Sequence, residues 1–271
     1  MTGAATPGGE PPELNTHVPH SARVWNYLLG GKDNYPPDRE AGEMILKMFP
    51  DFARIARLQR RFLIRAVRFL VAEAGIRQFL DIGTGLPTQD NTHEVAQRLA
   101  PESRVVYVDN DPLVLVHARA LLTSTPQGAT DYLEADVREP ERILERAADT
   151  LDLDRPVGLM MLGILGQISD DDDPRGILDR LLSRLAPGSY LALSDGVDTN
   201  PALNQAVAAY NARSANTYHL RSPERIAGFF AGLELVEPGV VATSRWRPEP
   251  ADIGGPSPED EAALCGVARK A

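Results

Sequence analysis

A regular alternation of short apolar runs with helical segments, between residues 78 and 194, constrains the fold of this chain more than any other feature. Five runs have the length and composition of buried strands: 78–82, 104–108, 130–134, 157–162 and 190–194. Helical patterns fill the gaps between them, at 92–99, 112–121, 139–148 and 174–185. Strands separated by helices of this length join through right-handed crossovers into a parallel sheet with helices on both faces. The sequence therefore predicts an α/β, doubly wound fold.

The segments on either side of this alternation define the predicted domains. A helix over 201–212, a helix start at Ser222 and two closing strands, 232–236 and 263–268, bring the expected sheet to seven mostly parallel strands. Residues 1–16 are rich in Pro, Gly and Thr, so we expect a mobile tail. Residues 17–75 are expected to form an N-terminal helical cap, and residues 76–271 the ligand-binding domain.

Three helices are predicted within the cap. The first covers 22–29, with Ser21 as its cap and Gly30-Gly31 as its end; Pro36 and Pro37 are expected to keep the following loop extended before a helix near Asp38. The third covers 52–74 and aligns five arginines on one arc: Arg54, Arg57, Arg61, Arg65 and Arg68. We interpret this stripe as a solvated face that pairs with acids, with recognition of an anion as the alternative.

Composition excludes several classes of function. The chain has 28 basic and 38 acidic residues and a net charge of −10, which disfavours nucleic acid as a partner. It has no apolar run long enough to span a membrane and no secretory signal, so we expect a cytoplasmic protein. The single cysteine, Cys265, cannot form an internal disulfide. We expect no metal site, because the acids 170–173 precede Pro174 as a solvated helix start.

The strand over 78–82 runs directly into a glycine turn, Gly83-Thr84-Gly85. Glycines at the carboxyl edge of a parallel sheet let the backbone approach a bound ligand closely. A dinucleotide-binding turn would carry a third glycine three residues after Gly85, but Thr88 occupies that position. A nicotinamide cofactor therefore becomes the weaker interpretation.

Acids follow the next two strands as well. Asp109 ends the second strand, where a carboxylate can accept both hydroxyls of an adenosine ribose. NAD and S-adenosylmethionine both carry such a ribose, whereas Asp111 is better placed to cap the helix at Pro112. Asp136 follows the third strand and can accept from an adenine amino group, while the amide of Val137 meets a ring nitrogen.

These three signals, in this order and spacing, resemble class I S-adenosylmethionine-dependent methyltransferases over roughly residues 75–240. A narrower resemblance covers nearly the whole chain beyond residue 17. It is to the actinobacterial S-adenosyl methyltransferase family formerly described only as a domain of unknown function, and it rests on HSARVWNYLLGGKDNY at 20–35, LPT at 86–88, NTHE at 91–94 and WRP at 246–248. The resemblance implies a Rossmann-like methyltransferase sheet and S-adenosyl-L-methionine as cofactor; the substrate stays open.

The same resemblance implies a role for each cofactor residue. Asp81 would orient the methionine amino group, and Gly83, Thr84 and Gly85 would pass beneath the methionine portion. Asp109 and Asn110 would flank the ribose, Asp136 and Val137 would hold the adenine, and Leu162 and Gly163 would border the methyl group.

Residues 21–35 are expected to cover the cofactor, because the carboxyl edge of such a sheet is otherwise open to water. Arg23 or Lys32 would then pair with the cofactor α-carboxylate, and Tyr27 or Tyr35 would line the acceptor pocket. His93, which opens the helix after the glycine turn, is a further candidate near the ligand. The alternative is that this segment packs on the core and Gly30-Gly31 is an ordinary helix stop.

The fourth strand leaves through an apolar loop, 163–168, that lacks the acid-Pro-Pro-aromatic signature of amino-group methyltransferases. We therefore expect a small, partly apolar acceptor. No catalytic triad is required, since a sulfonium methyl is already electrophilic. Two alternatives remain: a regulatory module that binds S-adenosylmethionine or S-adenosylhomocysteine without catalysis, and, less favoured, an NAD-dependent oxidoreductase.

Overall fold

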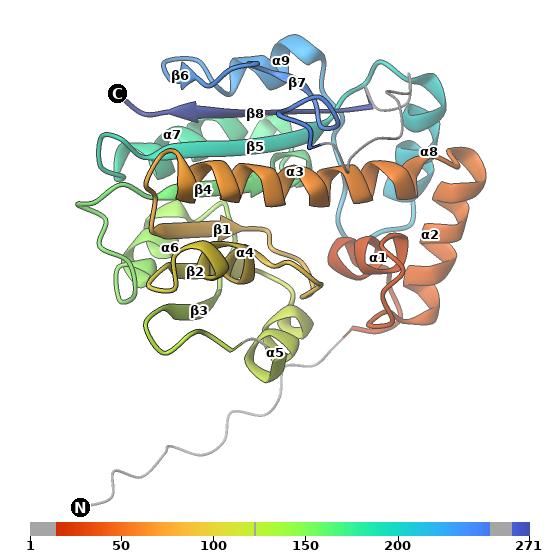
Figure 1. Cartoon of the computed structure of the whole chain (residues 1–271). Helices are drawn as coiled ribbons and strands as arrows, with labels where there is room; N and C mark the ends of the chain where they lie inside the picture. The colour runs from red at the N-terminus through yellow and green to blue at the C-terminus, as the bar shows by residue number, and fades with distance from the viewer. Residues whose placement is uncertain (1–14, 122, 250–261) are drawn as a thin grey trace, which may run out of the picture.

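The computed structural model describes residues 15–121, 123–249 and 262–271; all but the last two residues of the predicted mobile tail lie outside these ranges. Within them a single eight-stranded sheet runs through the molecule in the order β3-β2-β1-β4-β5-β8-β6, with β7 also paired to β8 (Figure 1). Its main strands are β1 (Gln78–Ile82), β2 (Arg104–Asp109), β3 (Ala129–Glu134), β4 (Gly158–Leu162), β5 (Tyr190–Gly196) and β8 (Ala263–Arg269). The first five are parallel and β8 is antiparallel to β5. The predicted doubly wound, mostly parallel sheet is confirmed.

The far edge of the sheet differs from the prediction. In place of one strand over 232–236 there are two short ones, β6 (Glu234–Leu235) and β7 (Val241–Ala242). Both pair with β8, β6 near Ala268 and β7 near Cys265, so together they occupy the seventh position. Pro238 and Gly239 stand between them, and a proline cannot donate to a strand ladder, which explains the break.

Alternate residues of the strands face two helical layers. Leu80 and Ile82 of β1 pack with α6 (Pro140–Ala147), α7 (Pro174–Ser183) and α9 (Pro223–Gly228). Phe79 packs on the opposite face with α3 (Phe52–Ala72) and α4 (Thr92–Leu99). α5 (Pro112–Leu121) lies beside β3 at the sheet edge. Because α3 covers the sheet, the C-terminal part of the expected cap is a layer of the core.

The other N-terminal helices lie beside the carboxyl ends of the parallel strands (Figure 1). α1 (Ser21–Leu28) and α2 (Pro36–Met48) pack there with α8 (Pro201–Asn211), which comes from the C-terminal half of the chain. Val24, Ile45 and Tyr210 share one buried cluster. This cluster forms a second body of side chains facing the strand ends.

Two predicted helix starts are wrong. Ser21 is the first residue of α1 and not its cap, a position that His20 takes without a side-chain hydrogen bond. Pro36 and Pro37 do not hold a loop extended but begin α2, because proline lacks the amide that the first helical turn leaves unpaired. Asp38, expected at the start of this helix, instead accepts a 2.8 Å hydrogen bond from the amide of Tyr35.

The arginine stripe of α3 is not uniformly solvated. Arg57, Arg61 and Arg68 are exposed, and Arg68 pairs with Glu249, as the solvated interpretation predicts. Arg65, however, is buried and donates to the backbone oxygens of Trp246 (2.8 Å) and Thr243 (2.5 Å). Arg65 therefore ties α3 to the segment that precedes β8.

In the ranges that the structure describes, no helix is both long and apolar enough to cross a lipid bilayer.

Candidate functional site

A pocket opens where the parallel strands end, and it has two walls of different origin. The sheet wall consists of residues at the carboxyl ends of β1 to β5 and in the loops that follow them, among them all ten predicted cofactor residues other than Arg23 and Lys32. The helical wall comes from α1, α2, α3, α8 and the loop between α8 and α9. The helical wall thus combines segments that precede the first strand in the sequence with segments that follow β5.

The glycine turn after β1 brings the backbone to the pocket surface. Gly83 has a φ of +73° and its amide donates to the Val108 oxygen at 2.8 Å, which fixes the turn against β2. A Cβ at Gly83 would lie 2.6 Å from Cδ1 of Ile164, so only glycine fits there. Gly85 has a φ of +64° but open space beside it. The turn Gly83-Thr84-Gly85 therefore forms a cradle with open space beside Gly85, which a side chain would otherwise occupy and a ligand can use.

Asp81 lies beneath this turn and is almost fully buried. Its Oδ2 accepts a 2.6 Å hydrogen bond from Oγ1 of Thr92 at the start of α4. Burial raises the pKa of Asp81 to about 6, while Thr92 and the nearby Arg60 charge oppose the rise. Asp81 is therefore a carboxylate at neutral pH that has no close cation bound to it in the described residues, a fitting partner for an ammonium group.

Asp109 at the end of β2 links the two nearest loops. One oxygen accepts from the amide of Gly85 and the other from the amide of Asp111, both at 2.9 Å. Burial raises the pKa of Asp109, and the two amides partly offset this effect. Each oxygen retains a second lone pair, so the carboxylate can still accept two hydroxyl hydrogens. Asp111 caps α5 through the amide of Leu113, as predicted.

Asp136 and Val137 line the pocket beyond β3. Asp136 is already paired with Arg138, whose Nη2 and Nε lie 2.7 and 3.0 Å from its two oxygens. Hydrogen bonds from this side chain lower the pKa of Asp136. Asp136 is thus a charged acceptor that a second donor would have to share with Arg138.

The helical wall is mostly apolar. It contains Trp25 and Leu28 of α1, Phe52 and Ile55 of α3, and Leu203 of α8. Its polar side chains include Gln59, Arg60, Asn216 and Tyr218. An apolar chamber with a few polar groups can hold an apolar molecule and orient a polar atom of it.

Arg60 is the charged residue that sequence reasoning missed. It lies on the pocket side of α3, next to the aligned arginines and outside their arc. One terminal nitrogen donates to the backbone oxygens of Gln89 (2.9 Å) and Asp90 (2.7 Å), whereas its buried Nε has no hydrogen-bond partner. Burial lowers the pKa of Arg60, and the Asp81 charge is the largest opposing effect. Arg60 thus combines a positive charge with a donor that has no partner among the described residues, and both could serve an anionic group of a ligand.

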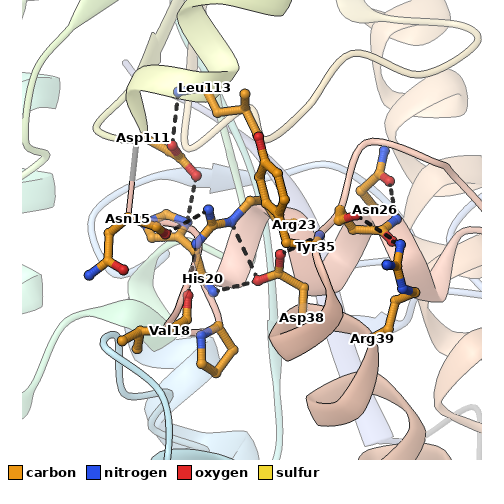
Figure 2. Close-up of polar contacts among 12 residues, drawn as sticks. Asn15, Val18, His20, Arg23, Asn26, Tyr35, Asp38, Arg39, Asp111 and Leu113 are labelled. Carbon is orange, nitrogen blue, oxygen red and sulfur yellow. Dashed lines mark hydrogen bonds and ion pairs between the residues drawn. The ribbon is translucent and has the colours of Figure 1, made fainter. Parts of the chain in front are cut away.

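The N-terminal motif holds the helices to the sheet (Figure 2). Arg23 is buried; its terminal nitrogens donate to the oxygens of Asn15 and Val18, and its Nε lies 3.4 Å from Asp38. His20 Nδ1 lies 2.9 Å from Asp111, just beyond the proposed ribose acid. Arg23 is absent from the described pocket lining, so the expected pairing with a cofactor carboxylate is not supported.

The second glycine of the motif has a packing role. A Cβ at Gly31 would lie 2.4 Å from the Asn26 side chain. That side chain accepts from the amide of Asp33 and from Nδ2 of Asn34, at 3.1 and 2.9 Å. Gly30, with a φ of +82°, ends the helix. The pair of glycines therefore needs no hinge to explain it, although α1 itself does cover the pocket.

Four other predicted residues lie away from the described pocket lining. Lys32 is exposed, and Tyr27 packs against Gly42 of α2. The ring of Tyr35 lies under the Arg23 guanidinium. His93 is buried with its amide and Nδ1 both 2.8 Å from the Tyr107 hydroxyl, and burial lowers the pKa of its ring. The packing alternative fits Tyr27, Tyr35 and His93, and Lys32 faces solvent.

Asp195 and Tyr218 form a second polar group that the sequence analysis did not single out. The Tyr218 hydroxyl donates to Oδ1 of Asp195, and Tyr218 lines the pocket. Asp195 lies near the end of β5, as Asp81 and Asp109 do in their strands, and that position was the available signal. Tyr218 lies in a loop without periodic pattern, so no local signal marked it.

Comparison with known proteins identifies a family and several solved structures that this chain resembles. The family model described as S-adenosyl methyltransferase matches residues 7–271. The structure of a DUF574 family protein from Streptomyces avermitilis superposes with a TM-score of 0.92 at 48% identity, over 96% of this chain and 100% of that one. A Thermobifida fusca structure superposes with a TM-score of 0.87 at 44% identity, over 96% of this chain and 98% of that one.

Among curated proteins, a carboxy-S-adenosyl-L-methionine synthase of Chromohalobacter salexigens is 28% identical over 171 residues, which are 60% of this chain and 58% of that protein. The chain thus spans less than two thirds of the length of this relative. An S-adenosylmethionine-dependent methyltransferase of Anabaena variabilis shares the fold, with a TM-score of 0.50 at 14% identity over 77% of this chain and 83% of that one. The family model matches nearly the full length, so the chain belongs to the S-adenosyl methyltransferase family, with S-adenosyl-L-methionine as its cofactor.

Proposed function

We propose that this protein transfers the methyl group of S-adenosyl-L-methionine to a small, largely apolar molecule held against the helical wall. The observation that carries the proposal is the division of one pocket into a wall of strand-end acids and glycines and a wall of apolar helix side chains. The first suits a nucleoside with an amino-acid tail, and the second suits an acceptor without charge.

The sheet wall supports a specific orientation of the cofactor. Asp109 would accept the ribose hydroxyls, and Asp136 with the Val137 amide would meet the adenine. Gly83, Thr84 and Gly85 would pass under the methionine portion, and Asn110 would lie beside the ribose. Leu162 ends β4 in the centre of the sheet and Gly163 follows it, and both would border the methyl group.

Arg60 replaces Arg23 and Lys32 as the proposed partner of the methionine carboxylate. Arg60 lines the pocket with an unpartnered Nε, and its charge interacts with that of Asp81. A carboxylate on the sheet wall and a guanidinium on the helical wall, both lining one pocket, match the ammonium and carboxylate of an amino acid. This pair would anchor the methionine end while the acids after β2 and β3 hold the nucleoside.

The protein's contribution to methyl transfer is then alignment and exclusion of water. The cofactor supplies an electrophilic methyl group. The chain would hold the acceptor in line with it and surround both with apolar side chains from α1, α3 and α8, because a bound nucleophile in the right orientation reacts far faster than a free one.

Calorimetry with S-adenosylhomocysteine, S-adenosylmethionine and NAD tests the cofactor site. We expect the first two to bind and NAD not to bind. Asp109→Ala should weaken binding at least tenfold, since two ribose hydroxyls lose an acceptor at about 1.5–3 kcal/mol. Asp149→Ala, which removes an exposed acid far from the pocket, is the matched control. Unchanged affinity in Asp109→Ala would contradict the ribose assignment.

Incubation with methyl-labelled cofactor and a cell extract tests the acceptor. After fractionation, we expect the label in small organic-soluble molecules. Label confined to nucleic acid or protein would contradict the proposed acceptor class, and binding without any label transfer would favour the regulatory alternative.

A further inference from the structure

Tyr218 occupies a slot that two glycines keep open. A Cβ at Gly166, just after β4, would lie 2.3 Å from Cζ of the Tyr218 ring. A Cβ at Gly196, at the end of β5, would lie 2.6 Å from Cδ2 of Leu220 and 3.3 Å from Cε1 of the Tyr218 ring. Neither glycine has a positive φ, so space for the Tyr218 ring, and at Gly196 also for Leu220, accounts for them rather than backbone conformation. The slot fixes the ring between two strand exits.

The backbone of Tyr218 is held as firmly as its ring. The Asn211 side chain at the end of α8 accepts from the Tyr218 amide and donates to the Tyr218 oxygen, both at 2.8 Å. The following residue, His219, donates its amide to the Gly166 oxygen at 2.7 Å. A side chain fixed from three sides is preorganised for a defined contact.

The known hydrogen bonds of the Tyr218 hydroxyl leave one lone pair of its oxygen free to accept another. It donates its only hydrogen to Asp195 and accepts from the amide of Gly196 at 3.2 Å. Asp195 is held in turn by the amides of Gly166 and Gly196, at 2.7 and 3.1 Å. A phenol oxygen has two lone pairs, so one stays available on a side chain that lines the pocket.

We propose that the Tyr218 hydroxyl, backed by the Asp195 carboxylate, accepts the proton of a nucleophilic hydroxyl on the methyl acceptor. This inference rests on the methyl transfer proposed above. It specifies the acceptor as an apolar molecule with one hydroxyl directed at Tyr218, because a hydroxyl, unlike a neutral amine, must lose its proton to give a stable methylated product.

The charges around Asp195 suit this role. Burial raises the pKa of Asp195 to about 6, while Tyr218 and Arg221 oppose the rise, so the group is a carboxylate at neutral pH. Arg221 is itself engaged with the oxygens of Leu165 and Ile168 and with Asp170. The His219 ring is directed elsewhere, at Thr217, 3.1 Å away. Asp195 thus keeps its negative charge without a direct ion pair among the described residues.

The proton and electron balance is simple. The acceptor oxygen forms a bond to the methyl carbon, the carbon–sulfur bond breaks, and its electron pair stays on sulfur. The acceptor's proton moves to Tyr218 as the Tyr218 proton moves to Asp195, which becomes a neutral acid. Asp195 returns its proton to solvent after the product leaves. Tyr218 is the catalytic residue here, and Asp195 acts through it.

Two probes test the inference without knowledge of the natural acceptor. 2-Naphthol and 2-methoxynaphthalene share a bicyclic apolar ring, but only the first can donate a hydrogen bond. Titrated into the full-length protein with S-adenosylhomocysteine present, 2-naphthol should bind about tenfold more tightly, as expected for a hydrogen bond backed by a charge. Tyr218→Phe and Asp195→Asn should remove that preference while leaving S-adenosylhomocysteine affinity unchanged, and thermal melting should show that both variants are folded.

Tyr190→Phe removes a tyrosine hydroxyl from the opposite end of β5 and should retain the preference. The preference should also shrink from pH 7 to pH 5 in the wild type, as Asp195 protonates, and show no such change in Asp195→Asn. Equal affinity for the two probes, binding of neither, or a preference that survives in Tyr218→Phe would overturn the inference. Loss of S-adenosylhomocysteine binding in the wild type would instead overturn the proposed function.

Discussion

The two walls of the pocket differ in how they are built. The acids Asp81, Asp109 and Asp136 of the sheet wall stand at or just after the ends of strands, so their positions follow from the parallel sheet. The helical wall joins α1, α3, α8 and a loop that are far apart in sequence, and its shape depends on how those segments pack. The proposed nucleoside contacts therefore depend mainly on the topology, whereas the proposed acceptor chamber depends on tertiary packing.

The largest expected effect tests the sheet wall at its tightest point. Gly83→Val places a β-branched residue at a φ of +73° and a Cβ 2.6 Å from Ile164. Backbone strain and overpacking of about 1–3 kcal/mol each should reduce S-adenosylhomocysteine affinity about a hundredfold in calorimetry. Gly85→Ala, with open space beside it, should cost less than tenfold. Similar losses in both variants would show that the cradle is not specific to Gly83.

Arg60 is the point where the helical wall is proposed to reach the cofactor. Arg60→Met keeps the length of the side chain and removes its charge, so we expect about a thirtyfold loss of S-adenosylhomocysteine affinity, close to 2 kcal/mol for a hydrogen bond to a charged group. 5′-Methylthioadenosine lacks the amino-acid tail and is the control ligand. Equal losses for both ligands would place Arg60 elsewhere than at the carboxylate.

A pH titration separates the anchoring charges from the apolar wall. Burial raises the pKa of Asp81 to about 6, so its carboxylate is largely ionised at pH 7 and largely protonated at pH 5. If only the ionised form binds the ammonium group, S-adenosylhomocysteine affinity should fall about tenfold as pH decreases over this range. The fall should be much smaller in Asp81→Asn. An affinity that rises toward pH 5 would contradict the assignment.

The smallest effect on the cofactor is expected from the helical wall itself. Leu28→Ala removes buried apolar contacts beside the acceptor chamber, so it should change S-adenosylhomocysteine affinity less than threefold and weaken 2-methoxynaphthalene binding about tenfold. Both affinities can be measured on one preparation after thermal melting has shown that it is folded. If the two fell together, the walls would not act as separate recognition surfaces.

The same difference explains what the sequence could predict. Asp81, Asp109 and Asp136 stand at strand ends, and the structure brings all three to one pocket. Asp195 also stands near a strand end, at the end of β5, but it belongs to none of the motifs on which the family resemblance rests. Arg23, by contrast, stands in a distinctive motif, yet its nitrogens face Asn15, Val18 and Asp38. A conspicuous motif can serve assembly, and only packing distinguishes assembly from ligand binding.

Helical periodicity also concealed one site residue. The arginines at 54, 57, 61, 65 and 68 repeat every three to four positions and draw attention to one arc of α3. Arg60 falls outside that repeat, and this is why it reaches the pocket. The loop that carries Tyr218 has no period at all, and its slot depends on glycines 22 and 52 positions away in the chain, Gly196 and Gly166.

The contact of α1 and α2 with α8 also bears on biosynthesis. Val24 and Ile45 are translated before any strand, but Tyr210, which completes their buried cluster, follows β5. During translation, the apolar faces of α1 and α2 that contact α8 therefore stay exposed until most of the sheet has been synthesised. Contacts between segments so distant in sequence form slowly. The acids at the strand ends, by contrast, come together as soon as β1 to β3 have paired. We therefore expect a nascent chain to acquire its nucleoside-binding surface first and its acceptor chamber last.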